Sequence, residues 1–403
     1  MNIGYDAKRA YQNCTGLGHY SRTLLASLAQ FYPKNNYYLF APKITGMFNT
    51  SGISNMHPVC PVHFPATACK SMWRSNWVKQ DLLTYNIDLY HGLSHEIPVG
   101  IADTGIKSVV TIHDLIFERY PTHYKPVDRF IYRTKFRYAC KHADKIIATS
   151  RQTKQDIIDF YKIPEEKIVV CYQSCNPQFS QTIPEEKKEA VRLLYKLPQS
   201  FYLYVGSIIE RKNLLLVCRA LKKLNGNIPL VVIGDGGAYK QTVKKYIAEN
   251  GLQYNVIFLS ESPSAISSES FRSSFDFPAI YQMATAIIYP SMFEGFGIPV
   301  LEAFCSRLPV ITSDLSCLPE IGGNAALYVD TTTEMELAAA MQAVFYDNNL
   351  RNRMIEKGIL QTQLFTQQKS AEAVMEVYKK VCNNGEPFIL NAQRSNSLVG
   401  LTP

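Results

Sequence analysis

Several patterns that mark other classes of protein are missing from this chain. None of its fourteen aspartates belongs to an Asp-x-Asp pair, so the sequence offers no paired-carboxylate site for Mg²⁺ or Mn²⁺. Its ten cysteines include no Cys-x-x-Cys pair, which favours free thiols in a reducing compartment over a disulfide framework or a zinc site. No apolar run reaches the roughly 18 residues that cross a bilayer, and the N-terminus MNIGYDAKRA has no apolar signal core. These absences predict a cytoplasmic protein without a bound metal.

Length and charge indicate two domains with different surfaces. A chain of 403 residues is too long for one ordinary core and suits two domains of about 150 to 200 residues. Residues 1–180 hold 21 Lys and Arg against 13 Asp and Glu, whereas residues 181–403 hold 21 of each. The whole positive excess therefore lies in the first half. Because that half has no aromatic and basic RNA motif and no zinc finger, an anionic lipid surface or a phosphorylated acceptor suits it better than nucleic acid.

Short β-branched runs alternate with amphipathic helical patterns along the chain, which is typical of parallel sheets covered by helices on both faces. In the first half the predicted strands are residues 2–5, 37–40, 88–91, 108–112, 145–148 and 167–170. In the second half they are residues 201–205, 230–233, 256–259, 286–289, 310–312 and 326–328. We therefore predict an α/β fold with two doubly wound, Rossmann-like domains. Ligands bind beyond the carboxyl ends of such strands, so the two domains are expected to face one cleft.

The domain boundaries are predicted where these patterns lapse. The predicted parts are a first domain over residues 1–173, a polar linker over 174–200, a second domain over 201–365, a C-terminal helix over 366–382 and a disordered tail over 383–403. The C-terminal helix is expected to pack back toward the first domain. Within the second domain, residues 262–277 carry seven serines and are expected to form a mobile loop.

The most informative segment is YPSMFEGFGIPVLEA, residues 289–303. It follows a predicted buried strand; Gly295 and Gly297 permit a tight turn, and Pro299 suits the first position of a helix. The free N–H groups and the dipole of such a helix start form an anion site suited to a diphosphate. Glu294 on the loop and Glu302 in the opening turns of the helix can accept hydrogen bonds from sugar hydroxyls. The pattern indicates a bound sugar nucleotide. In the alternative interpretation, Glu294 is a solvated loop residue and Glu302 only complements the helix dipole.

The whole string resembles the Glu-x7-Glu segment of retaining glycosyltransferases with the GT-B fold, in particular family 4, also described as glycosyltransferase group 1. The resemblance covers about residues 1–380. It implies that Glu302 accepts hydrogen bonds from the ribose of a nucleotide diphosphate sugar and that Glu294 binds hydroxyls of the transferred sugar. It further implies that the donor lies against the turn residues Gly295, Phe296, Gly297 and Ile298.

A second motif, GSIIERKN over residues 206–213, follows the first predicted strand of the second domain. Arg211 can hold phosphate oxygens bidentately and Lys212 adds a compact charge, so the pair can stabilise a leaving nucleoside diphosphate. The string resembles the phosphate-binding Arg-Lys segment of the family, which implies donor contacts at Gly206 and Ser207 as well. A solvated pair of cations at a loop is the alternative.

Two segments of the first domain complete the expected donor site. Residues 15–20, TGLGHY, resemble the family's glycine loop, which implies that Gly16 and Gly18 bring main-chain amides to the donor phosphate, with His19 in place of the usual arginine. His113 ends a predicted strand and matches the family's His-Asp, which implies a place beside the transferred sugar. A structural role for this strand-end histidine is the alternative. The predicted catalytic residues are His113, Glu294, Arg211 and Lys212.

Further residues are assigned to the acceptor or to the membrane. Trp73, Arg74 and Trp77 lie in a stretch where both tryptophans of the chain alternate with cations, and residues 129–141 add a basic and aromatic cluster. Tryptophans beside cations suit a membrane interface, although a core Trp77 with solvated cations fits equally well. His91 ends another predicted strand and is similar to the cleft-lining histidine of family members.

These patterns together predict a retaining, metal-independent hexosyltransferase that moves a sugar from a nucleotide diphosphate sugar to an acceptor hydroxyl of a glycan or lipid-linked glycan. The first domain would face the acceptor and the second would bind the donor, with no further cofactor. The chain resembles bacterial mannosyltransferases of surface polysaccharide synthesis, which implies GDP-mannose as the donor. The basic first half and its tryptophans predict a place at the inner face of the membrane. A nucleotide-sugar 2-epimerase of the same fold and a nucleotide-sugar binding protein without turnover stay open as alternatives.

Overall fold

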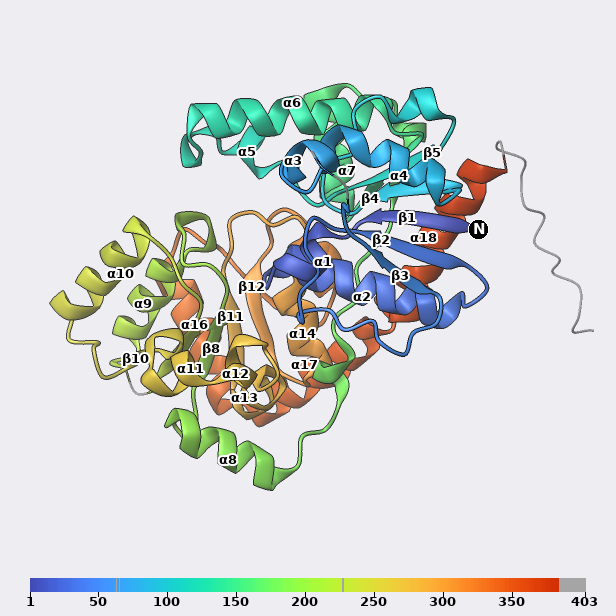
Figure 1. Ribbon diagram of the computed structural model, residues 1–403. Helices are drawn as coiled ribbons and strands as arrows, with labels where there is room; N and C mark the ends of the chain where they lie inside the picture. The colour runs from blue at the N-terminus through green and yellow to red at the C-terminus, as the bar shows by residue number, and fades with distance from the viewer. Residues whose placement is uncertain (63, 65, 227, 384–403) are drawn as a thin grey trace, which may run out of the picture.

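The computed structural model describes residues 1–62, 64, 66–226 and 228–383. These residues form two parallel sheets, each covered by helices on both faces, and the two halves of the molecule face one another (Figure 1). The predicted α/β fold with two Rossmann-like domains is confirmed. Of the tail predicted to be disordered, all residues except Asn383 lie outside the described part of the chain.

The first sheet has its strands in the order β3-β2-β1-β4-β5-β6-β7. They are β1 (Asn2–Asp6), β2 (Asn36–Phe40), β3 (Met56–Val59), β4 (Leu89–Gly92), β5 (Lys107–Ile112), β6 (Lys145–Ala148) and β7 (Ile168–Val170). All except β3 match predicted strands to within one residue at each end. The sequence hides β3 because it contains Pro58, which cannot donate to a ladder and is tolerated there because β3 is an edge strand.

The second sheet has its strands in the order β10-β9-β8-β11-β12-β13. They are β8 (Tyr202–Val205), β9 (Leu230–Ile233), β10 (Val256–Phe258), β11 (Ala286–Tyr289), β12 (Val310–Ser313) and β13 (Leu327–Val329). Every one matches a predicted strand to within one residue at each end. Strands β8, β9, β11 and β12 are buried along their whole length, because helices cover both faces of a parallel sheet.

Most helices lie on the faces of the sheet in their own half. The first half carries α1 (Lys8–Gln12), α2 (Gly16–Phe31), α3 (Lys70–Met72), α4 (Val78–Thr84), α5 (Ile116–Arg119), α6 (Pro126–His142) and α7 (Arg151–Tyr161). The second half carries α8 (Glu185–Tyr195), α9 (Leu214–Lys223), α10 (Ala238–Glu249), α11 (Pro263–Ser267), α12 (Glu269–Arg272), α13 (Phe277–Met283), α14 (Ile298–Cys305), α15 (Leu318–Gly322), α16 (Glu334–Tyr346) and α17 (Asn348–Thr362).

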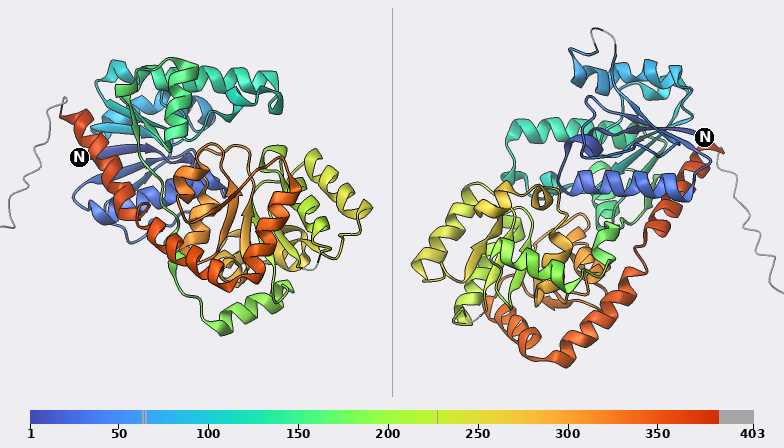
Figure 2. Two further views of the ribbon diagram at one scale, coloured as in Figure 1. Left: turned by 180° about the vertical axis from the view of Figure 1, so that it is seen from behind. Right: turned by 60° about the horizontal axis from the view of Figure 1, so that its bottom comes forward.

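The last helix, α18 (Gln367–Cys382), leaves the second half and runs along the first, beside α2 (Figures 1 and 2). Its residues Val374, Val377 and Tyr378 are buried in one core with Leu24 and Leu28 of α2. The chain therefore passes between the two halves twice, once after β7 and once before α18. Two crossings restrain how the halves can move relative to each other.

The stretch predicted as a linker contains a structured helix. Residues 185–195 form α8, and Val191 and Tyr195 are buried in a core of the second half together with Phe201. Only the residues on either side of this helix connect the two halves. The sequence pattern did not predict α8, because the first four residues of this helix, EEKK, are all charged and its large apolar residues begin only at Val191.

The serine-rich segment 262–277 is helical, and the prediction of a mobile loop there is wrong. It forms α11, α12 and the start of α13. The hydroxyls of Ser262 and Ser268 cap α11 and α12 by accepting hydrogen bonds from the N–H groups of Ala265 and Phe271. Serine is among the preferred residues for such caps. The serines that suggested a mobile loop therefore include the residues that start two helices. The buried side chains of Ala265 and Phe271 hold the segment against the second half.

Candidate functional site

The candidate site lies between β8 and β11, where the strand order of the second sheet reverses, which is the usual place for a ligand in a doubly wound sheet. Beyond β8 the chain forms a short 3-10 helix, η6 (Glu210–Lys212), and beyond β11 it forms the loop that carries Glu294. The Oε1 atom of Glu294 lies 3.0 Å from Nη1 of Arg211 and 3.1 Å from Nζ of Lys212. The same oxygen accepts a 2.9 Å hydrogen bond from the hydroxyl of Tyr289. The structure thus brings three of the predicted catalytic residues into contact.

Two glycines allow η6 to lie close to the sheet. Gly206 has a φ of 140°, and a Cβ there would lie 2.9 Å from Nζ of Lys212. Gly234, just beyond β9, has a φ of 150°, and a Cβ there would lie 1.9 Å from the carbonyl oxygen of Gly206. Gly206 therefore belongs to the site through its backbone. Ser207 is exposed, and its hydroxyl makes no hydrogen bond with any residue that the structure describes.

The charges in this cluster are set by burial and by one another. Burial alone would raise the pKa of the Glu294 carboxyl, but Lys212 and Arg211 outweigh it and lower this pKa to about 2. Burial also lowers the pKa of the Lys212 ammonium, against the attraction of Glu294. Glu294 is therefore ionised at neutral pH, and the cluster combines two cations with one anion. The remaining positive charge suits an anionic ligand such as a diphosphate.

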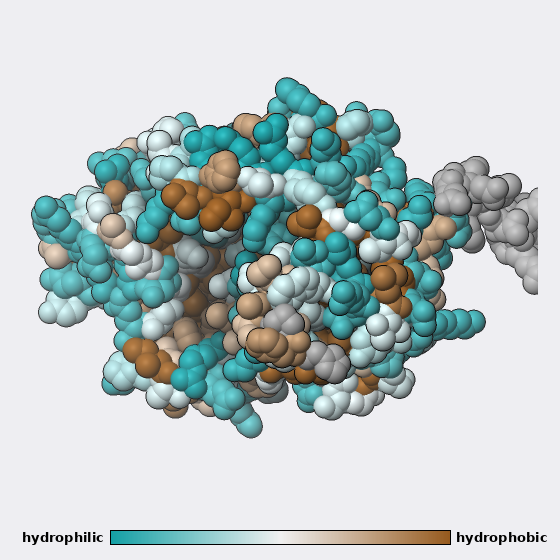
Figure 3. All heavy atoms as spheres, turned by 45° about the horizontal axis from the view of Figure 1, so that its top comes forward, coloured by the Kyte–Doolittle hydropathy of each residue, from teal (hydrophilic) through white to brown (hydrophobic). Residues whose placement is uncertain are grey.

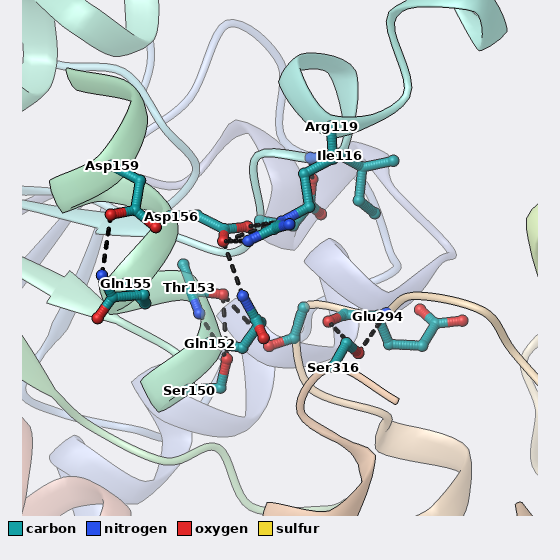
Figure 4. A network of polar contacts seen from close by, with 12 residues as sticks. Ile116, Arg119, Ser150, Gln152, Thr153, Gln155, Asp156, Asp159, Glu294 and Ser316 are labelled. Atoms are coloured by element: carbon teal, nitrogen blue, oxygen red, sulfur yellow. Dashed lines mark hydrogen bonds and ion pairs between the residues drawn. The ribbon is translucent and has the colours of Figure 1, made fainter. Parts of the chain in front are cut away.

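The loop that carries Glu294 touches the first half of the molecule (Figure 4). The N–H of Glu294 donates a 2.9 Å hydrogen bond to Oγ of Ser316, which fixes the main chain of the loop. At the next residue, Gly295, a Cβ would lie only 2.1 Å from the carbonyl oxygen of His113. Position 295 must therefore be glycine because the end of β5 and the loop after β11 meet there.

The sequence did not predict two threonines that lie where the end of β5 meets the loop after β11. The hydroxyls of Thr149 and Thr153 each lie 3.0 Å from the carbonyl oxygen of His113 and 3.4 Å from that of Gly295. They therefore bridge the two halves. Thr149 directly follows β6, so its position at the carboxyl end of a parallel strand was the signal that could have found it.

Arg9 is a further residue that the sequence did not single out. It lies in α1, directly beyond β1, and it has no carboxylate partner among the residues that the structure describes. Its Nε atom is buried without a hydrogen bond. In addition to burial, the charge of Arg9 lowers the pKa of His95 and His113, which places this cation near the end of β5. Arg9 is thus a cation of the first half, with a buried and unsatisfied Nε, near the end of β5.

His113 is buried at the end of β5. Its ring packs edge-on against the ring of Tyr20 from α2, with 4.6 Å between the ring centres. Its Nε2 atom lies 2.9 Å from the carbonyl oxygen of Leu93, and because a carbonyl can only accept, Nε2 carries the proton. Burial lowers the pKa of His113 to about 4, so the ring is neutral near pH 7. A neutral imidazole in this place can form a hydrogen bond with a sugar hydroxyl but adds no positive charge.

The glycine loop of the first half forms the start of α2. Gly16 is its first residue, and at Gly18 a Cβ would lie 1.8 Å from the carbonyl oxygen of Asn13, so packing requires glycine there. Nε2 of His19 lies 3.1 Å from the carbonyl oxygen of Cys14, and burial lowers the pKa of His19 to about 4. Within the described residues, no hydrogen bond or ion pair connects this loop to the cluster between β8 and β11.

The helix start predicted after the glycine-rich turn is present. Helix α14 begins at Ile298, directly after Gly297, whose φ is 95°. Glu302 lies in the second turn of α14, where one carboxylate oxygen accepts a 2.9 Å hydrogen bond from Tyr281. The side chain of Phe296 is buried in a core of the second half. Only the main chain of Phe296 is therefore left for a ligand.

The tryptophan and arginine segment does not form the membrane surface that the sequence suggested. The side chain of Trp73 is buried, and its Nε1 atom donates a 2.5 Å hydrogen bond to Asp81. Arg74 forms a 2.6 Å ion pair with Asp6. Trp77 is partly buried against the same core as Trp73. The prediction of a membrane or acceptor contact is wrong for Trp73 and Arg74, because core packing and ion pairing occupy both side chains.

His91 is also structural. It is fully buried, with Nδ1 2.6 Å from the hydroxyl of Tyr378 in α18 and Nε2 2.8 Å from the hydroxyl of Thr111 in β5. Burial lowers the pKa of His91 to about 3. The predicted place in the cleft lining is wrong, because this histidine joins α18 to the first sheet. The decisive partner, Tyr378, lies 287 positions away in the sequence.

Two models of known protein families match the chain. The model described as Glycosyltransferase Family 4 matches residues 16–179, and the model described as Glycosyl transferases group 1 matches residues 185–361. The chain is a member of glycosyltransferase family 4. In this glycosyltransferase, His113 lies within the first match, and the cluster of Arg211, Lys212 and Glu294 lies within the second.

Known relatives agree with this family, and a solved structure shares the fold. The glycosyltransferase is 27% identical to O-antigen chain mannosyltransferase B of Escherichia coli, over 76% of this chain and 77% of that protein. It is 29% identical to O-antigen chain mannosyltransferase RfbU of Salmonella typhimurium, over 58% of this chain and 60% of that protein. Its fold is similar to that of HepE from Anabaena, solved in complex with UDP and glucose, with a TM-score of 0.70, 15% identity and coverage of 94% and 99% of the two chains. The fold is GT-B.

Glu302 predicts a pH-dependent stability for this glycosyltransferase. Burial raises the pKa of its carboxyl from the ordinary 4.5 to about 7, against the hydrogen bond from Tyr281. Between pH 4.5 and about pH 7, the carboxyl holds its proton in the folded state but loses it in the unfolded state. The free energy of unfolding therefore falls as the pH rises through this range, and it does not recover above pH 7. The loss is at most about 3 kcal/mol.

We expect the melting temperature of the wild type to fall more between pH 5 and pH 8 than that of Glu302→Gln, which has no carboxyl to ionise. Thermal unfolding of both proteins at the two pH values measures this difference. Parallel changes in the wild type and the variant would show that Glu302 titrates in its ordinary range.

Proposed function

We propose that the protein transfers a hexosyl group from a nucleotide diphosphate sugar to an acceptor hydroxyl, with retention of configuration and without a metal. The observation that carries this proposal is the buried cluster of Arg211, Lys212 and Glu294 at the point where the strand order reverses. The two cations and the nearby start of α14 supply positive potential for a leaving diphosphate. The ionised Glu294 can accept hydrogen bonds from hydroxyls of the transferred sugar.

In the proposed reaction the acceptor oxygen forms a bond with the anomeric carbon of the donor sugar. The bond from that carbon to the diphosphate oxygen breaks, and the diphosphate leaves with its electron pair. The leaving oxygen takes the acceptor's proton on the same face of the sugar, which preserves the anomeric configuration. Arg211 and Lys212 stabilise the negative charge that develops on the leaving diphosphate. Their attraction to the diphosphate is stronger in the transition state than in the bound substrate, and this difference speeds the reaction.

The names of the relatives support a mannosyl donor and a polysaccharide acceptor. The two relatives named above are O-antigen chain mannosyltransferases, so we propose GDP-mannose as donor and a growing surface glycan or lipid-linked glycan as acceptor. The structure of HepE with UDP and glucose supports a nucleotide and a sugar as ligands of this fold. Among the described residues of our protein, no group of three or more His, Cys, Asp or Glu side chains is placed to hold a metal ion.

Product analysis tests the proposed function. Incubation with a panel of nucleotide sugars, with and without a glycan acceptor, is expected to yield a glycoside that keeps the donor's anomeric configuration in NMR spectra. Activity is expected to persist in EDTA, because protein cations replace the metal. An inverted product, or inhibition by EDTA that Mg²⁺ or Mn²⁺ reverses, would contradict the mechanism. Free nucleotide and an altered sugar formed without acceptor would indicate an epimerase instead.

We also propose that α6 docks the first half on anionic membranes. Val127, Phe130 and Ile131 of α6 are 68%, 69% and 42% exposed, and their i, i+3, i+4 spacing places them on one side of the helix. Residues 125–142 contain six Lys and Arg but one acidic residue. Figure 3 shows apolar side chains gathered beside the hollow between the two halves. Apolar residues flanked by cations are typical of a helix that lies in a membrane interface.

Within the described residues no helix is long and apolar enough to cross a bilayer. We expect the protein to bind anionic vesicles at low salt, and Phe130→Ser to weaken this binding about tenfold or more, because a buried phenylalanine contributes about 1.5–3 kcal/mol. Raising the salt should release the protein, since each cation near the surface contributes about 1 kcal/mol and is screened within about 10 Å at roughly 0.1 M.

Sedimentation with anionic and neutral vesicles measures this binding. The matched control is Leu360→Ser in α17, because Leu360 is 70% exposed and lies in the neutral second half. If both variants lose binding equally, or if neutral vesicles bind as well as anionic ones, α6 is not the docking surface.

A further inference from the structure

A cavity of about 660 Å³ lies between α2 and the second half. Helix α2 contributes His19, Thr23 and Ala26, whose i, i+4, i+7 spacing places them on one side of the helix. Tyr20 lies on another side of α2, where it touches His113. The cavity is thus next to the candidate site but separated from His113 by the body of α2. Its volume lies within the roughly 300–1,000 Å³ that is usual for ligand cavities.

The opposite wall of the cavity is the serine-rich segment. Its conformation is held by Asp276, whose carboxylate accepts hydrogen bonds of 2.6 Å from Tyr195 in α8 and 2.5 Å from Ser270. Ser274 has a φ of 63°, which residues other than glycine rarely adopt. The turn at Ser274 presents Phe275, which is 51% exposed, as part of the cavity wall. The segment therefore forms this wall, and Tyr195 of α8 supports it through Asp276.

The side chains that line the cavity suit a neutral ligand with many hydroxyls. Most of the polar ones are uncharged: Thr23, Asn176, Gln178, Ser273, Ser274 and Gln367. Arg22 is partly satisfied, because its Nη1 atom donates to the carbonyl oxygens of Ala10 and Asn13. Met47, Phe48 and Phe275 add apolar surface.

Amides and hydroxyls can both donate to and accept from sugar hydroxyls, and aromatic rings can cover the apolar faces of sugar rings. Three charged side chains also line the cavity, Arg22, Arg272 and Glu269. Nη1 of Arg272 donates a 3.2 Å hydrogen bond to the carbonyl oxygen of Ile266, and Glu269 offsets one of the two positive charges. Because uncharged amides and hydroxyls outnumber the charged side chains, the lining suits a carbohydrate with many hydroxyls.

We propose that this cavity binds sugar units of the acceptor glycan that do not themselves react. The inference rests on the proposed glycosyl transfer. A glycan whose end reacts beside His113 would leave the cleft over the start of α2, where Cys14 and His19 begin the cavity. This gives the serine-rich segment a function: it forms a rigid second-half wall for the acceptor chain.

Calorimetry without donor tests the proposal. Tetrasaccharides of mannose, glucose and galactose are compared, each with its methyl monosaccharide. We expect at least one tetrasaccharide to bind wild-type protein at least tenfold more tightly than its monosaccharide. Phe275→Ala on one wall and Ala26→Trp on the other should each lower that affinity at least tenfold. Tyr254→Ala, at a residue that is 86% exposed and outside the cavity, is the control.

Melting temperatures establish that the two cavity variants are folded. Equal affinity of the wild type for every tetrasaccharide and its monosaccharide would overturn the proposal, and so would unchanged affinity in both folded variants. The assay contains no donor, so it is independent of turnover. Tetrasaccharide binding without any sugar transfer would contradict the proposed function alone, whereas transfer without a preference for tetrasaccharides would contradict the cavity proposal alone.

Discussion

Lys212→Met is expected to lower kcat/KM for sugar transfer by about 10- to 100-fold. The ammonium of Lys212 contacts Glu294 over 3.1 Å and the hydroxyl of Tyr289 over 2.7 Å, inside the cluster that would receive the diphosphate. Loss of one charge-assisted hydrogen bond to the leaving group costs about 1.5–3 kcal/mol of transition-state stabilisation. The fold should survive, because Arg211 still balances the charge of Glu294.

Steady-state kinetics with the preferred donor measure this effect. The control is Lys245→Met, which changes the same residue type at a side chain that is 74% exposed on α10. This control should leave kcat/KM unchanged. If Lys212→Met behaves like the control, Lys212 does not contact the donor, and the role assigned to Arg211 loses its support.

Glu294→Gln and Glu302→Gln are expected to have separable effects, the first on sugar transfer and the second on nucleotide binding. Glu294→Gln should lower transfer about 100-fold through the loss of its charged hydrogen bonds to the sugar, but it should not weaken binding of the bare nucleoside diphosphate. The reason is electrostatic: removing the anion leaves Arg211 and Lys212 without their counter-charge, so the cluster becomes more positive.

Glu302→Gln should instead lower nucleoside diphosphate affinity about tenfold at pH 8, through the loss of a charged acceptor for the ribose hydroxyls. The pKa of Glu302 is raised to about 7, so its carboxyl is mostly ionised at pH 8 and mostly protonated at pH 6. The difference between wild type and variant should therefore shrink at pH 6.

Calorimetry with the bare nucleoside diphosphate at both pH values separates the two roles. If Glu294→Gln weakens this ligand as much as Glu302→Gln does, the assignment of one carboxylate to the sugar and the other to the ribose is wrong. If the effect of Glu302→Gln is equally large at pH 6, its ionised form is not what binds the ribose.

The two halves meet through main-chain atoms near the proposed reaction centre. Gly295 touches the carbonyl of His113, and Thr149 and Thr153 lie within hydrogen-bonding distance of both carbonyls. The loop that carries Glu294 is therefore positioned by the first half as well as by its own sheet. A change in the relative placement of the halves would therefore move the loop that carries Glu294.

The sequence by itself determined every strand except β3, and the turn that starts α14. The predicted strands agree with the structure to within one residue because a strand covered on both faces must be a short apolar run, which is a local pattern. The start of α14 at Ile298 was readable because Gly297 and Pro299 act within a few residues of it. Arg211, Lys212 and Glu294, which meet between β8 and β11, were found because each follows a readable strand end.

Only the tertiary structure decided which polar residues face a ligand and which face the core. The sequence suggested that Trp73 and Arg74 face a membrane or an acceptor. In the structure Trp73 donates a hydrogen bond to Asp81, and Arg74 forms an ion pair with Asp6, both inside the first half. His91 is held by Tyr378, 287 positions away. Such pairings depend on contacts between distant segments, and a buried polar group is stable only when such a partner is present. Local patterns in the sequence carry no record of these partners, so the fold alone distinguishes a satisfied core residue from one that is open to substrate.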